Sequence, residues 1–186
     1  MSQFSVFSFF LSLTLKDPSI EDSYRKAVFL PGESEPCLLE ILNLAGSPGA
    51  VDFSSENHFS SLAPHLIRFY PFAIVVFSVL SRISFERACA YVEHIKRVWK
   101  KEEKEARFVL VGNKIDMRPV SPDAITTKEG ESLAKSLGAL RYFETSAKTF
   151  EGIETMFVGC VSMMKEYVNA EELRKDGKEE GKCILS

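Results

Sequence analysis

The sequence has no run of about 18 apolar residues, no closely spaced pair of cysteines and no excess of basic side chains. The first absence leads us to expect no membrane-spanning helix. The four cysteines are widely scattered, which argues against a disulfide framework or a zinc site and fits a reducing compartment. A formal net charge of −3, without a basic stripe, gives no reason to expect nucleic acid as a partner.

The composition is that of an ordinary globular protein, with 45% apolar and 26% charged residues in a chain of 186. This length suits one domain, which we expect over residues 1–168. Residues 4–15 form an apolar run without the positive flank and cleavage site of a secretory signal, so we expect a buried strand or helix turn. From about Asn169 the chain turns polar and charge-mixed, which predicts a flexible tail over residues 169–186.

Short apolar runs alternate with amphipathic stretches along the rest of the chain. The runs predict strands near residues 37–44, 72–79, 107–111 and 140–144. One helix is predicted between the second and third runs, with Ser84 as its N-cap, and another after the capping-box pair Thr126 and Glu129. The last helix carries one apolar face, formed by Ile153, Met156, Phe157, Cys160, Val161 and Met164.

This alternation predicts an α/β fold with three layers, in which a mostly parallel sheet has helices on both faces. Such sheets bind ligands beyond the carboxyl ends of their strands. The loops that follow Leu44, Val111 and Glu144 are therefore the places where we expect functional residues.

The loop after the third run reads Gly112-Asn113-Lys114-Ile115-Asp116. A carboxylate at this point can accept hydrogen bonds from the N1–H and the exocyclic amine of guanine, and adenine offers no such donor pair. Asn113 can reach the base edge or tie neighbouring loops, and the stem of Lys114 can lie across the purine face.

A second loop, Glu144-Thr145-Ser146-Ala147-Lys148, follows the next strand. The N–H of Ala147 can meet the guanine carbonyl oxygen, and Ser146 can brace Asp116. Two such loops in the right order, each after a predicted strand, indicate a guanine-binding site much more strongly than either loop alone.

These loops resemble the base-reading loops of the small GTPases, and of the Ras family in particular. The resemblance runs from about Asp17 to the C-terminus and also includes residues 39–46, which are similar to the strand ahead of the family's DxxG loop. It implies GTP or GDP and Mg²⁺ as ligands, Ras-type effectors and regulators as partners, and a monomeric chain. The implied guanine-binding residues are Asn113, Lys114, Asp116, Ser146, Ala147 and Lys148. The implied effector loop consists of Asp17, Pro18, Ser19, Ile20, Glu21, Asp22, Ser23 and Tyr24.

The sequence departs from the family's pattern at the phosphate end. The sixteen residues before Asp17 contain no GxxxxGK[ST] segment, no glycine, and no lysine before Lys16. Hydrogen bonds to charged groups contribute roughly 1.5–3 kcal/mol each. Losing four or five of them predicts an affinity for the nucleotide that is lower by a factor of at least about 10⁵.

Three further positions differ from the pattern. Asn43 stands where the DxxG segment has its aspartate, and Ser47 stands where the family places the glutamine that orients the attacking water. Ser19 replaces the usual threonine and is a weak candidate for a metal ligand. These changes predict impaired hydrolysis and leave no catalytic residue to assign, so the sequence leaves open whether the chain is an enzyme.

In this family the first strand is central in the sheet, and the strand, the P-loop and the first helix are missing or replaced here. Residues 5–14 have strand propensity, and we predict that they fill the central slot at least in part, with no helix before the effector loop. The alternative is that residues 1–16 are an atypical N-terminus of a truncated or misassembled gene product.

The chain ends in Cys183-Ile-Leu-Ser186, which has the CaaX form, and the final serine favours a farnesyl group on Cys183. Residues 171–182 hold four basic and five acidic side chains, so no polybasic patch supports the lipid. A single prenyl chain gives reversible anchoring. We therefore expect the chain at the cytoplasmic face of the plasma membrane or of endomembranes, and otherwise in the cytosol.

Two functional interpretations remain. In the first, the chain is a Ras-like GTP-binding protein of membrane-associated signal transduction that keeps its guanine-binding loops. In the second, it is a nucleotide-independent module that presents the effector loop to partners.

Overall fold

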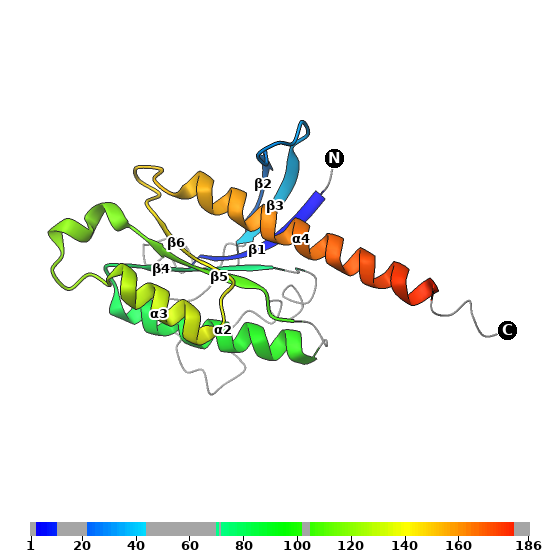
Figure 1. Ribbon diagram of the computed structural model, residues 1–186. Coiled ribbons are helices and arrows are strands. Elements are labelled where there is room, and N and C mark those ends of the chain that lie inside the picture. Colours follow the sequence, from blue (N-terminus) through cyan, green and yellow to red (C-terminus); the bar gives the residue numbers. More distant parts are fainter. Residues whose placement is uncertain (1–2, 11–21, 44–69, 71, 102–104, 181–186) are drawn as a thin grey trace.

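The computed structural model describes residues 3–10, 22–43, 70, 72–101 and 105–180. Figure 1 shows a sheet with helices on both faces, as the sequence predicts. The elements follow one another as β1 (Gln3–Phe10), β2 (Asp22–Val28), β3 (Cys37–Asn43), β4 (Ala73–Ser78), α2 (Arg82–Lys101), β5 (Phe108–Asn113), the 3₁₀ helix η1 (Ile115–Val120), α3 (Thr127–Leu137), β6 (Tyr142–Thr145) and α4 (Ile153–Glu180).

The six strands form one sheet in the order β2-β3-β1-β4-β5-β6. Strand β2 is antiparallel to β3, and every other pair of neighbours is parallel. The predicted α/β class with a mostly parallel sheet is confirmed.

Strand β1 occupies the centre of this sheet. It pairs in parallel with β3, where Val6 lies opposite Ile41, and with β4, where Phe9 lies opposite Val75. The prediction that residues 5–14 fill the central slot at least in part is confirmed for residues 5–10, and residues 11–14 lie outside the described residues. The predicted absence of a helix before the effector loop concerns residues 11–16 and lies outside the described residues.

Strand β4 is apolar from Ala73 to Phe77, and its packing shows why. Val75 and Phe77 belong to the core on the side of α2 and α3, whereas Ile74 and Val76 belong to the core on the side of α4. Both faces of a parallel strand are covered by helices, so each of its side chains is buried.

The start of α2 differs from the prediction. The helix begins at Arg82, and its first turn is capped by Ser81, whose Oγ accepts from the N–H of Ser84 at 3.2 Å. Ser84 itself is buried inside the helix, where its hydroxyl donates to the carbonyl of Ser81 at 2.9 Å and accepts from the N–H of Ser78 at 3.0 Å. Its place next to an apolar stretch favours Ser84 as the cap, but its hydroxyl bonds to the turn that precedes the helix.

The other helices match their predicted faces. The capping box at Thr126 and Glu129 is present, with both of its reciprocal hydrogen bonds. Met156, Cys160 and Met164 of α4 are buried against the sheet. However, α4 continues to Glu180, so the backbone is helical well past Asn169. Within the described residues, no helix has both the length and the apolar character that a bilayer span needs.

Candidate guanine-binding site

The two predicted base loops leave the sheet side by side. Strands β5 and β6 are parallel neighbours, and their last residues, Asn113 and Thr145, lie opposite each other in the register. Because carboxyl ends of parallel strands meet at one edge, the loops that follow must share that edge. Two of the three loops in which we expect functional residues, those after Val111 and Glu144, therefore lie at one edge of the sheet, and the loop after Leu44 lies outside the described residues.

Asn113 joins the two loops through its side-chain carbonyl. Its Oδ1 accepts from the N–H of Lys114 at 2.7 Å and from the N–H of Ala147 at 3.1 Å. The hydroxyl of Thr145 also lies 3.5 Å from this oxygen. Among the described residues, the amide nitrogen of Asn113 has no partner, so its two donors are available to a ligand.

Asp116 is held from the second loop. The Oγ of Ser146 donates to Oδ1 of Asp116 at 2.7 Å, and the same Oγ accepts from the N–H of Thr149 at 3.1 Å. Ser146 is fully buried, whereas Asp116 is half-buried. The second carboxylate oxygen of Asp116 has no partner in the part of the chain that the structure describes. The predicted brace is therefore present, and it leaves acceptor capacity on the carboxylate.

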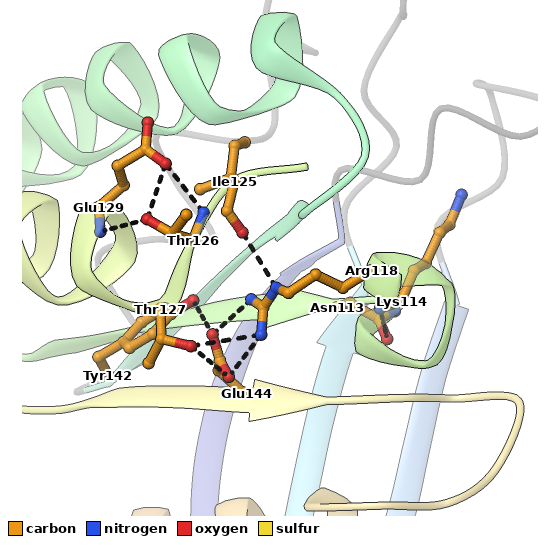
Figure 2. Close-up of polar contacts among 9 residues, drawn as sticks. All are labelled: Asn113, Lys114, Arg118, Ile125, Thr126, Thr127, Glu129, Tyr142 and Glu144. Atoms are coloured by element: carbon orange, nitrogen blue, oxygen red, sulfur yellow. Dashed lines mark hydrogen bonds and ion pairs between the residues drawn. The ribbon is translucent and has the colours of Figure 1, made fainter. Parts of the chain in front are cut away.

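Lys114 and Lys148 lie at the border of the site. Lys114 has a left-handed backbone, with φ 69° and ψ 34°, where the chain turns from β5 into η1. Its side chain extends away from the polar cluster around Glu144 (Figure 2). Within the described residues, neither the Lys114 nor the Lys148 ammonium forms an ion pair.

Behind these loops lies a charged cluster that sequence reasoning missed. The guanidinium of Arg118 makes a two-pronged contact with Glu144, from Nη2 to Oε1 at 2.6 Å and from Nη1 to Oε2 at 3.0 Å. Tyr142 and Thr127 donate to the same carboxylate at 3.0 and 3.1 Å (Figure 2). The pairing joins residues far apart in sequence, so no local spacing could have revealed it.

The cluster perturbs the protonation of its members. Burial by itself would raise the pKa of Glu144, but the hydrogen bonds from Arg118, Tyr142 and Thr127 outweigh it and lower that pKa. The hydrogen bond with Glu144 raises the pKa of Arg118. Burial, followed by the charge of Glu144, raises the pKa of Tyr142. Glu144 therefore stays ionised, and Arg118 keeps its partner over a wide pH range.

With this geometry established, a comparison with protein-family models matches residues 10–166 to the Ras family. The match covers most of the chain. The chain belongs to the Ras family. Members of this family are small GTP-binding proteins, and they generally bind GTP or GDP together with Mg²⁺ and interact with effectors and regulators.

The described Ras-family site fits the base of such a nucleotide. A free carboxylate oxygen on Asp116 and free amide donors on Asn113 suit the donors and acceptors along one edge of guanine. The N–H of Ala147, predicted to meet the guanine carbonyl, donates to Asn113 instead, so a base would have to share or replace that bond.

The metal end of this Ras-family chain is less well described. The described residues contain no group of three His, Cys, Asp or Glu side chains able to hold a metal ion. Ser19, Ser47 and Cys183 lie outside these residues.

The effector segment is described only in its second half. Residues 17–21 lie outside the described part of the chain, whereas Asp22, Ser23 and Tyr24 begin the edge strand β2. There Ser23 pairs with Leu42 of β3, and the Tyr24 side chain is 49% exposed.

Proposed function

We propose that this Ras-family chain reads guanine through its two base loops and contributes little to phosphate binding or hydrolysis. The observation that carries the proposal is the Asp116 carboxylate, which Ser146 holds through one oxygen while the other has no partner among the described residues. A carboxylate that is fixed before the ligand arrives needs little reordering, which favours binding.

Base selection follows from the same carboxylate. Guanine presents two adjacent N–H donors to it, and adenine presents an unprotonated N1 instead. Each hydrogen bond to a charged acceptor contributes roughly 1.5–3 kcal/mol. The site should therefore prefer guanine to adenine nucleotides by a factor of about 10² or more.

The phosphates add little in this proposal because the sequence holds no GxxxxGK[ST] segment. We expect GMP, GDP and GTP to bind with affinities within about tenfold of one another, whereas a phosphate-binding loop would separate them far more. We also expect phosphate release from GTP at no more than the rate without protein, because Asn43 and Ser47 stand at the positions of the DxxG aspartate and the glutamine.

The test is a titration of the full chain with GDP and ADP in magnesium buffer, up to millimolar nucleotide. GDP should saturate and ADP should not. Asp116→Asn should weaken GDP binding by about a hundredfold or more, since an amide cannot accept both base donors. Asp123→Asn is the matched control, because Asp123 is exposed in the following segment and should leave binding unchanged. Equal binding of GDP and ADP, or no GDP binding, would reject the proposal.

The cellular setting is part of the same proposal. A farnesyl group on Cys183 would place the chain reversibly at the cytoplasmic face of a membrane, in signal transduction. Incubating the chain with a farnesyltransferase and labelled farnesyl diphosphate tests this step, with Cys183→Ser as control. Label on both chains, or on neither, would rule it out.

A second candidate is a nucleotide-independent module that presents its effector segment. The exposed Tyr24 side chain on edge strand β2 favours it. Partner binding should then be the same with GDP, with GTP and without nucleotide, and should fall on Tyr24→Ala.

A further inference from the structure

The short helix η1, which carries Asp116, is not fixed by the hydrophobic core. None of its residues is buried, and only Ile115 packs in part against the core on the α2 side. It follows a sharp left-handed turn at Lys114. The placement of Asp116 must therefore depend on the polar contacts of η1.

Arg118 provides the strongest of these contacts. Besides its two bonds to Glu144, its Nε donates to the carbonyl of Ile125 at 3.1 Å. Ile125 is fully buried, and its own N–H donates to Val79 at 2.7 Å. Arg118 thus connects η1 to both the core and strand β6.

Glu144 fixes the other side of the site. It lies on β6 directly before the second loop, and Tyr142 and Thr127 orient its carboxylate. Its main-chain carbonyl also packs against Gly152, where an added Cβ would lie 2.2 Å away. The pair Arg118 and Glu144 therefore joins a rigid strand to a helix that has few other anchors.

The pair is also protected from water, which strengthens it. The side chains of Arg118 and Glu144 are 25% and 21% exposed. A two-pronged contact between guanidinium and carboxylate fixes direction as well as distance, which a lysine cannot do.

We propose that Arg118 and Glu144 act as positioning residues that aim the Asp116 carboxylate at the exocyclic amine of guanine. The inference rests on the proposed function, because it concerns the same base site. Neither side chain touches the base in this proposal. Their effect is on selection between guanine and a purine that lacks the amine, such as hypoxanthine.

The experiment compares GDP with inosine diphosphate (IDP), which differs only by the absence of that amine. A hydrogen bond to a carboxylate changes affinity by roughly ten- to a hundredfold, so the wild-type chain should prefer GDP by about that ratio. Arg118→Ala should lower the ratio about fivefold or more, and Arg118→Lys should not restore it. General destabilisation would lower the amount of binding-competent protein without changing the ratio.

Two further variants keep the test decisive. Arg82→Ala removes another arginine–glutamate pair, Arg82 with Glu129 at 2.8 Å, which lies between α2 and α3 and should leave the ratio unchanged. Glu144→Gln keeps the side chain's shape and removes its charge. If circular dichroism shows that Arg118→Ala is unfolded, the GDP-to-IDP ratio is measured with Glu144→Gln instead.

The outcomes separate the two proposals. A wild-type chain that does not prefer GDP to ADP removes the guanine site and the positioning role with it. The positioning role alone is overturned by a different result. In it, the wild-type chain prefers GDP to ADP and to IDP, but the GDP-to-IDP ratio of Arg118→Ala stays within twofold of the wild-type ratio. If Arg118→Ala is unfolded, the same comparison is made with Glu144→Gln.

Discussion

The ring of Tyr142 lies between Gly112 and Gly130. We predict that alanine at either glycine destabilises the fold, and that removing the Tyr142 hydroxyl restores more stability at Gly112 than at Gly130. A Cβ on Gly112 would lie 2.4 Å from the Tyr142 hydroxyl, whereas its next contacts, Val79 and the ring carbon Cζ, are at 3.2 and 3.3 Å. A Cβ on Gly130 would lie 2.3 Å from both the Tyr142 hydroxyl and Cζ, and 2.8 Å from Cε1. Alanine at Gly112 therefore conflicts mainly with the hydroxyl, whereas alanine at Gly130 conflicts with the hydroxyl and with the ring.

The energies can be approximated from the same contacts. Alanine in place of glycine stabilises a strand or helix by about 0.5–1 kcal/mol. Overpacking costs about 1–3 kcal/mol, and displacing the hydroxyl also loses its hydrogen bond to Glu144, roughly 1.5–3 kcal/mol. We expect Gly112→Ala and Gly130→Ala each to destabilise the fold by about 2–5 kcal/mol.

The background Tyr142→Phe separates the two cases. It removes the hydroxyl, so Gly112→Ala should then cost less than about 1 kcal/mol, whereas Gly130→Ala should still cost about 1–3 kcal/mol because its contacts with Cζ and Cε1 remain. Urea unfolding of the six chains, with m-values compared, gives the two coupling energies. Because Tyr142 also stacks on Phe77, with centroids 6.3 Å apart, the ring should keep its place in Tyr142→Phe. Equal coupling at both glycines would refute this reasoning.

Two other predictions concern titration and reactivity. Hydrogen bonds from the backbone and side chain of Thr126, followed by that of Arg82, lower the pKa of Glu129 to about 2; the ionised carboxylate therefore stabilises the fold above its unfolded-state pKa, and this contribution is lost as the pH falls towards 2. Glu129→Gln should flatten this acid limb of a stability–pH curve, measured by urea midpoints, and an unchanged limb would contradict the assignment. Burial raises the pKa of the Cys160 thiol to about 12, so iodoacetamide at neutral pH should leave Cys160 intact in the native chain and modify it in guanidinium, as read by peptide mass spectrometry. Equal alkylation in both states would show that the native thiol is accessible.

The parts of the fold that the sequence predicts are those set by local chemistry. The run in β4 is apolar from Ala73 to Phe77 because helices cover both faces, and the capping box at Thr126 and Glu129 needs only neighbouring residues. The brace between Ser146 and Asp116 was also predicted, since it follows from two loops at one sheet edge. Each of these features follows from the sequence of one element or from the order of two strands along the chain.

The features that the sequence does not reveal depend on distant partners. Arg118 and Glu144 lie on different elements, and nothing near either residue marks the pairing. The 3₁₀ helix η1 has no apolar period because none of its residues is buried. Ser84 has the position of a cap in the sequence, but its hydroxyl bonds to Ser78 across a turn. In each case a tertiary contact decided the outcome.

The central place of strand β1 also constrains how this chain can fold. The first strand along the chain pairs with β3 on one side and with β4 on the other. It cannot complete its pairing until the chain as far as Val76 is available, so the sheet depends on contacts between residues distant in sequence. Until then, β1 has no partner on its β4 side, and this unpaired edge can pair with another chain. We therefore expect the chain to fold slowly and to aggregate more readily during synthesis than once folded.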